Sequence, residues 1–268
     1  MKTKKHLLCF DFDGTIITSD AAPSGVTVES AYRSAVLITF GTNGLIAYEL
    51  TGHIGSRGPG EIVTDILDFA QLNNMTVKNM LKDPSILTNQ FSHIILEIIL
   101  PEISPEWPCT FDGFAEIRQK ALSLPVVCAI VSNSHKDIIS RVFEVNRMEL
   151  PEIIVATERL QEEQSLHRVK PDPFSLELAK QDSIGRYGNL VSAIMIGDND
   201  KKDGGMSRAA GIPFGHFTPS STFGLEIFHV CREIRFKDYA RLNEVLFAQE
   251  EIYWSGNGFH EVFLRSYK

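Results

Sequence analysis

The chain has 268 residues, of which 43% are hydrophobic and 22% are charged, and its formal net charge is −8. This length supports one large domain or two smaller ones, and the composition is that of a globular protein with a sizeable core. The acidic balance argues against a nucleic-acid-binding protein, because such proteins neutralise phosphates with Lys and Arg. The sequence also has no apolar run long enough to span a membrane.

The cysteines and the first residues indicate the compartment. The four cysteines are far apart and form no CxxC pair, and Cys9 and Cys128 lie inside apolar runs, where cysteine acts as a small buried hydrophobe. A structural zinc site or a disulfide framework is therefore not expected. The first five residues are basic like the start of a secretion signal, but the apolar run after them, residues 7–10, is too short for one. We expect a reduced, cytoplasmic protein.

The first apolar run is followed by a segment with a different pattern. Residues 7–10 read as a short buried strand, and Asp-Phe-Asp-Gly-Thr comes directly after them. From residue 23 to residue 108 the pattern is helical, with candidate helices at 28–40, 61–72 and 86–100. A crossover between parallel strands needs only a dozen or so residues. The sequence therefore predicts an inserted, all-helical subdomain.

The strand pattern resumes after the insert. Short apolar runs bounded by polar turns occupy residues 126–131, 153–156, 193–196 and 212–214. Such runs are typical of strands that are buried on both faces of a parallel sheet. Two helices are predicted between them, one with Ser134 as its cap and one with Asp172 as its cap and Pro173 in its first turn. Strand and helix in alternation predict a doubly wound, mainly parallel α/β sheet.

The C-terminal part departs from this alternation. Residues 238–247 form an amphipathic pattern, and beyond them two aromatic-rich stretches flank Ser255-Gly256-Asn257-Gly258, which is a signal for a β-hairpin. We assign residues 1–20 and 109–248 to the α/β core, 21–108 to the helical insert and 249–268 to a C-terminal extension.

Polar side chains follow the predicted strands at their carboxyl ends, the edge where doubly wound sheets bind ligands. So many carboxylates close together repel one another unless a cation is present, and their hard oxygen ligands suit Mg²⁺. The sequence therefore predicts a magnesium site at this edge. The residues are Asp11, Asp13, Ser132, Asp198, Asp200 and Asp203, with Lys170 at a helix entrance.

These residues lie in motifs that resemble a known family. Asp11-Phe12-Asp13-Gly14-Thr15 matches the first motif of the haloacid dehalogenase (HAD) superfamily of phosphohydrolases. Residues 131–133, residues 170–173 and Gly197-Asp198 with Asp203 resemble its second, third and fourth motifs, in the same order. The resemblance covers residues 6 to about 215, and the insert resembles the helical cap of the phosphoglycolate phosphatase and β-phosphoglucomutase branch. It implies a Rossmann-like HAD core.

The resemblance implies a magnesium-dependent phosphatase with covalent catalysis. Asp11 would attack phosphorus and form an aspartyl phosphate, which splits one difficult step into two. Asp13 would protonate the leaving oxygen and then deprotonate the incoming water. Lys170 would offset the negative charge that gathers at Asp11 and the phosphoryl group.

The resemblance also assigns ligands to the remaining residues. Gly14, Thr15, Ser132 and Asn133 would hold the phosphoryl group. Asp198 and Asp203 would hold Mg²⁺ together with the carboxylate of Asp11 and the backbone carbonyl of Asp13, and Asp200 is the alternative to Asp203.

In the cap, His53 and Arg57 belong to a Gly-rich loop that faces the active site in related enzymes. Arg57 would clamp an anionic group of the substrate; the alternative is an exposed loop with a solvated arginine.

Other functions compete with this prediction. Dehalogenases are not expected to carry the second aspartate, so Asp13 argues against them, and phosphonate hydrolases need a cap lysine, for which Lys78 and Lys82 are the candidates. A sugar phosphomutase shares every core residue and stays open, as does a partner-binding role for the C-terminal extension.

We expect a small phosphorylated metabolite as the partner, with neither nucleic acid nor membrane, and a monomer or homodimer. The sequence does not select among phosphoglycolate, sugar phosphates, nucleotides and phosphoproteins, although the cap favours small molecules.

Overall fold

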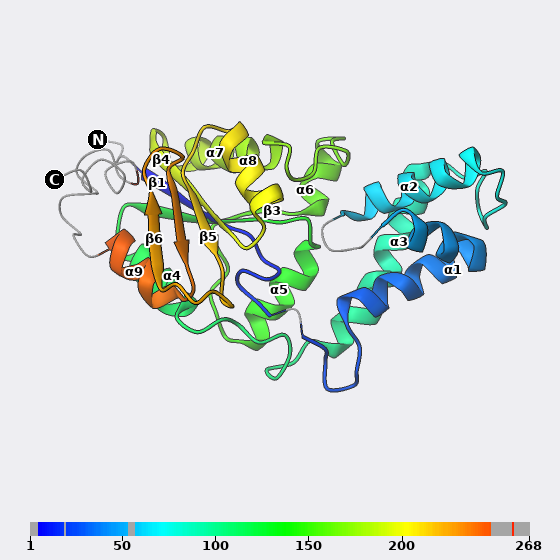
Figure 1. Ribbon diagram of the computed structural model, residues 1–268, viewed down its shortest axis with the longest axis horizontal. Helices are drawn as coiled ribbons and strands as arrows, with labels where there is room; N and C mark the ends of the chain where they lie inside the picture. The colour runs from blue at the N-terminus through cyan, green and yellow to red at the C-terminus, as the bar shows by residue number, and fades with distance from the viewer. Residues whose placement is uncertain (1–4, 19, 53–56, 248–258, 260–268) are drawn as a thin grey trace.

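The computed structural model describes residues 5–18, 20–52, 57–247 and 259. Its centre is a seven-stranded sheet in the order β3-β2-β1-β4-β5-β7-β6 (Figure 1). All neighbouring strands are parallel except β6 and β7. The predicted mainly parallel α/β sheet is therefore confirmed. The strands are β1 (Lys5–Phe10), β2 (Val126–Val131), β3 (Ile153–Val155), β4 (Leu190–Gly197), β5 (Phe214–Phe217), β6 (Leu225–Phe228) and β7 (Glu233–Phe236).

The predicted apolar runs correspond to the first five strands with one shift. The run at 212–214 reaches only the first residue of β5, since Pro213 has no N–H to donate to a neighbouring strand and the ladder begins with Phe214. Strands β6 and β7 escape prediction, because each has four residues and a charged side chain, Glu226 or Arg235, interrupts its apolar pattern.

Helices cover both faces of the sheet, which confirms the doubly wound arrangement. Leu8 and Phe10 of β1 pack in one hydrophobic cluster with α4 (Phe114–Leu122), α5 (Lys136–Val145) and α9 (Tyr239–Phe247). Leu7 and Cys9 point to the other face, where a second cluster contains side chains from α6 (Thr157–Glu162), α7 (Phe174–Tyr187) and α8 (Gly205–Ala209). All six residues of β2 are buried, as expected for a strand between two helical layers.

The insert after β1 is helical, as predicted. It contains α1 (Val28–Leu50), α2 (Pro59–Leu72), α3 (Pro84–Ile99) and the short 3₁₀ helix η1 (Leu100–Glu102). Figure 1 shows these helices together, to one side of the sheet. The helix predicted at 28–40 ends where α1 is interrupted, because Gly41 adopts φ 73° and ψ −171°, but helical backbone resumes and continues to Leu50.

Two helix starts each differ from the predictions by one residue. The N-cap of α5 is His135 rather than Ser134, whose hydroxyl points elsewhere. Helix α7 begins at Phe174 with Pro173 at its N-cap, yet the carboxylate of Asp172 still accepts the N–H of Phe174 at 2.8 Å. The capping chemistry of Asp172 was thus predicted, and its position was displaced by one residue.

The hairpin predicted in residues 249–268 lies outside the described residues, except for Phe259. Within the described part of the chain, no helix is both long enough and apolar enough to cross a membrane.

Candidate active site

The site begins where the order of the strands reverses. From β1 the chain proceeds to β2 and β3 on one side, and β4 and β5 lie on the other side of β1. Asp11 follows β1 and Asp198 follows β4, and the N–H of Asp11 donates to the carbonyl of Ile196 at 2.8 Å. The two acids therefore lie side by side at the carboxyl edge, at the switch point where open α/β sheets bind ligands.

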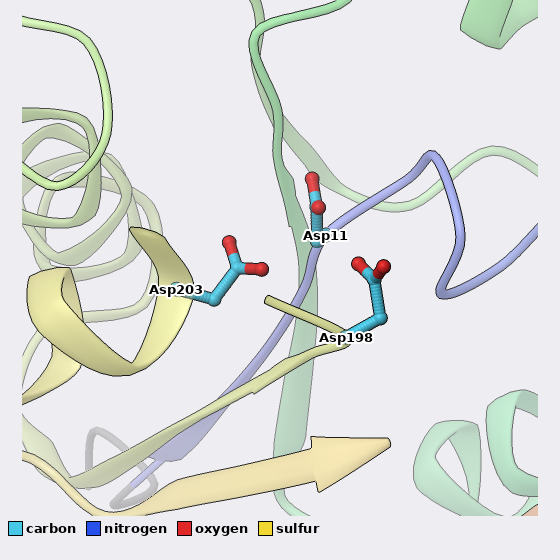
Figure 2. A group of neighbouring side chains, drawn as sticks. All are labelled: Asp11, Asp198 and Asp203. Atoms are coloured by element: carbon cyan, nitrogen blue, oxygen red, sulfur yellow. The ribbon is translucent and has the colours of Figure 1, made fainter. Parts of the chain in front are cut away.

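A π-helical turn brings the third acid to the same place. After β4, η2 (Asp200–Gly204) is held by Asn199, whose carbonyl accepts the N–H of Asp203 at 2.8 Å. Figure 2 shows Asp11, Asp198 and Asp203 converging, each with a carboxylate oxygen within 4.8 Å of the others. Asp200, the alternative in the sequence, is instead exposed and pairs with Arg208 at 2.8 Å.

Lys170 connects two members of this acidic cluster. Its ammonium donates to Oδ1 of Asp11 at 2.6 Å and to Oδ1 of Asp203 at 2.7 Å, and its side chain is only 3% exposed. Burial alone would lower the pKa of Lys170, but the two carboxylates outweigh it and raise the pKa above its ordinary value. Lys170 is therefore a fixed positive charge at the edge of the sheet.

The acidic cluster has the chemistry of a cation site. Burial and the neighbouring Asp11 carboxylate raise the pKa of Asp203 above its ordinary value, because the protein alone does not fully offset the repulsion among three ionised acids. Lys170 contacts Oδ1 of Asp11 and Oδ1 of Asp203, and Oδ2 of Asp203 accepts the N–H of Asn199 at 3.2 Å. Each carboxylate still has lone pairs that a cation could use, because a carboxylate accepts at about four sites. Carboxylates at this spacing fit Mg²⁺, which takes hard oxygen ligands.

Asp13 lies on the other side of the loop and contacts a different partner. Its Oδ2 accepts a hydrogen bond from the hydroxyl of Ser134, which comes from the loop before α5. Burial raises the pKa of Asp13 from 3.8 to about 6, and the Ser134 hydrogen bond opposes part of that rise. Asp13 can therefore exchange a proton near neutral pH.

The residues predicted to bind phosphate differ in their position relative to the pocket. Gly14, Ser132 and Asn133 line the pocket above the acids. Gly14 adopts φ +73°, and a Cβ there would lie 2.5 Å from Oδ2 of Asp198, so the loop needs glycine at this position. Ser132 accepts the N–H of Ser134 at 3.0 Å, which fixes the turn that follows β2.

Thr15 occupies a different place from the other three residues. It is fully buried and its hydroxyl donates to Oδ1 of Asp198 at 3.2 Å, while its carbonyl accepts the hydroxyl of Tyr239 at 2.8 Å. Thr15 thus supports the metal-site acid, and its side chain is not among the residues that line the pocket.

A pocket of about 510 Å³ lies over the acids, and core and cap residues both line it. Arg57 is one of the cap residues. Its side chain is 14% exposed and forms an ion pair with Asp65 at 2.6 Å, so it is not a solvated arginine. His53 lies outside the described residues.

Two functional features escaped sequence reasoning. Ser134 was interpreted as a helix cap, and only the fold turns its hydroxyl to Asp13. Lys202 was not singled out, yet it is half-buried and lines the pocket. Burial lowers the pKa of Lys202 despite the nearby carboxylate of Glu61. Its position next to Asp203 was the only signal in the sequence.

The sequence matches no protein-family model and no curated protein sequence. Solved structures do match. A predicted phosphoglycolate phosphatase from Haemophilus somnus 129PT is 16% identical with a TM-score of 0.56, and the match covers 91% of this chain and 98% of that one. CbbY from Rhodobacter sphaeroides, in complex with phosphate, is 16% identical with a TM-score of 0.53, over 88% and 95%.

A third structure is that of YfnB from Bacillus subtilis, a proposed HAD-hydrolase bound to magnesium, which is 13% identical with a TM-score of 0.50 over 91% of this chain and 99% of that one. The chain has the HAD fold. At these identities the likeness concerns the fold alone. In this HAD fold, residues from all four sequence motifs meet at one sheet edge: Asp11, Ser132, Lys170, Asp198 and Asp203 all line the same pocket.

Proposed function

We propose that this protein is a magnesium-dependent phosphatase that hydrolyses a small phosphate monoester through an aspartyl phosphate on Asp11. The observation that carries the proposal is the contact of one buried lysine with both Asp11 and Asp203, beside Asp198. A nucleophilic carboxylate, a fixed cation and a cation site next to it are what phosphoryl transfer needs, since that reaction depends on positioning and charge stabilisation. The crystal structures of HAD fold that contain magnesium or phosphate support the same reading.

In the first step an oxygen of Asp11 attacks phosphorus and the ester P–O bond breaks. Lys170 holds Oδ1 of Asp11, which leaves Oδ2 for the attack. Asp13, in the protonated form that its raised pKa of about 6 keeps accessible, gives its proton to the leaving oxygen, so the alcohol departs neutral.

In the second step water attacks phosphorus and transfers a proton to Asp13, which releases inorganic phosphate and free Asp11. Ser132, Asn133 and the N–H groups of their turn would hold the non-bridging oxygens. Asp11, Asp198, Asp203 and the Asp13 carbonyl would hold Mg²⁺, which when bound neutralises charge on the phosphoryl group. The pocket volume of about 510 Å³ suits a small metabolite.

The first prediction tests the nucleophile. We expect Asp11→Asn to lower the rate of phosphate release at least about a thousandfold, because loss of a nucleophile usually costs orders of magnitude. The measurement is phosphate release from a panel of small esters, with magnesium and with EDTA. Asp200→Asn is the matched control, since Asp200 is an exposed acid outside the cluster, and it should keep the wild-type rate. Residual activity above about a tenth in Asp11→Asn would exclude Asp11 as nucleophile.

A further inference from the structure

The pocket contains more basic side chains than the proposed transfer of one phosphoryl group requires. Three basic side chains line it: Arg57 from the cap, and Lys170 and Lys202 from the core. Lys170 is committed to Asp11 and Asp203, at 2.6 and 2.7 Å. The other two basic residues differ in what already neutralises them.

Arg57 is largely occupied by the cap itself. Its Nη1 lies 2.6 Å from a carboxylate oxygen of Asp65 and 3.3 Å from the hydroxyl of Thr51, and its Nη2 donates to the carbonyl of Gly52. The guanidinium also lies over the ring of Tyr48, at 5.7 Å from the centroid. These contacts neutralise its charge and fix its orientation.

Lys202 is in the opposite situation. No carboxylate among residues 5–18, 20–52 and 57–247 forms an ion pair with its ammonium. Its backbone N–H donates to the side chain of Asn199 at 3.1 Å, which places the residue in the π-helical turn η2. Its ammonium interacts electrostatically with Glu61 of α2 and with Asp11 and Asp203. Lys202 therefore lies between the cap and the acidic cluster.

Glu61 attracts Lys202 electrostatically but forms no ion pair with it, because one oxygen of its carboxylate is held at the start of α2. Its carboxylate accepts the N–H of Gly58 at 2.9 Å and so caps the start of α2. Much of the remaining pocket wall is apolar and includes Tyr32, Ile99 and Trp107. A half-buried ammonium beside such a wall is stabilised most by an anion that enters with the ligand, because a buried charge is more stable when it is paired than when it is alone.

We propose that Lys202 binds a second anionic group of the substrate, and that the natural substrates are phosphate monoesters which also carry a carboxylate or a second phosphate. The proposal rests on the phosphatase function above and names its substrate class. Asp11 and Lys170 take the phosphoryl group, and Lys202 selects the other end of the molecule.

The test is a binding measurement in the Asp11→Asn protein with magnesium, which does not consume the ligands. Calorimetry compares ethyl phosphate with phosphoglycolate, in which a carboxylate replaces the methyl group, and with ethane-1,2-diyl bisphosphate. We expect at least one of the two ligands with a second anionic group to bind more tightly than ethyl phosphate, and its identity tells carboxylate from phosphate. Adding Lys202→Met should reduce that preference about tenfold or more, as expected when a charge-assisted hydrogen bond is lost.

Lys201→Met is the matched control, because Lys201 is the exposed neighbour and its loss changes the net charge equally. It should leave the preference within about twofold, and Lys202→Arg should restore part of it. The proposal is overturned if Lys202→Met behaves like Lys201→Met. It is also overturned if all three ligands weaken equally, since Lys202 would then only balance the charge of the acidic cluster.

The two proposals fail in distinguishable ways. If wild-type protein with magnesium releases phosphate from ethyl phosphate, phosphoglycolate and ethane-1,2-diyl bisphosphate at equal efficiency, with no dependence on Lys202, the phosphatase stands and the second anion site falls. If the Lys202-dependent binding preference is present but no ester is hydrolysed, the anion site stands and the phosphatase falls.

Discussion

Asp13 and Ser134 meet across 121 residues of sequence, and their contact influences how the Asp13 carboxyl titrates. Burial favours the neutral acid, and the Ser134 hydroxyl favours the carboxylate because it donates a hydrogen bond to it. The resulting pKa of about 6 lets Asp13 act first as an acid and then as a base within one turnover.

Ser134→Ala should therefore move the pH dependence in a defined direction. Without the hydroxyl the pKa of Asp13 rises, and Asp13 stays protonated to higher pH. Because the proposed first step needs protonated Asp13, the falling limb of kcat/KM against pH should shift upward by roughly one pH unit. The measurement is a pH–rate profile with ethyl phosphate. An unchanged falling limb, in a variant with wild-type thermal stability, would show that Ser134 does not influence the acid.

At the scale of elements, the loop after β1 is built around Gly14, and Gly25 offers a matched comparison. Both glycines have positive φ, +73° and +86°. A Cβ at Gly14 would lie 2.5 Å from the Asp198 carboxylate, whereas one at Gly25 would meet no atom within 4 Å. Substitutions at the two positions therefore distinguish the effect of backbone strain from the effect of displacing Asp198.

We expect Gly25→Ala to cost about 1–2 kcal/mol in unfolding free energy, which is the usual price of left-handed backbone for a residue with a Cβ, and to leave turnover unchanged. Gly14→Ala should carry the same cost and also weaken magnesium binding at least about tenfold, because Asp198 must move away. Urea unfolding and a magnesium titration of activity measure the two effects. Equal magnesium affinity in both variants would contradict the proposed role of Asp198.

The sequence predicted the elements that carry strong local signals. Asp11 and Asp198 follow uniformly apolar runs, so their place at the carboxyl edge could be inferred from strand ends alone. Strands β6 and β7 could not be inferred, because four residues with charges among them are too short a run for an alternating pattern to stand out. The inward position of Lys202 depends on the π-helical turn, whose geometry has no recognisable sequence pattern.

At the scale of the whole molecule, the acidic cluster lowers stability in the absence of a cation. The folded protein raises the pKa of Asp13 to about 6 and also raises that of Asp203, whereas the ordinary value for both is 3.8. The folded state then binds protons more tightly than the unfolded state, so stability increases as pH falls through the raised pKa values toward about 4, and the ionised acids destabilise the fold at higher pH.

Magnesium should restore stability at pH values where these acids are ionised. At pH 8, magnesium at about 100 times its dissociation constant should raise Tm by about 5 °C or more, from roughly 2.7 kcal/mol of binding linkage. At pH 5.5 protons compete for the same oxygens and the increase should be smaller. Differential scanning calorimetry measures both. Asp203→Asn should lose most of the increase, and an increase that is equal at the two pH values would contradict a site made of these carboxylates.

The central position of β1 also governs how the chain acquires its structure. Strand β1 leaves the ribosome before both of its partners, β2 and β4, and about 180 residues separate its end from the start of β4. At 5–20 residues per second, the second of these partners appears roughly 10–40 s after β1. The helices α1, α2 and α3 form mostly local contacts and can assemble in the meantime. The apolar strand that precedes Asp11 can therefore pair with β2 first, but its other edge must wait for β4 and is exposed to association with other chains throughout that interval.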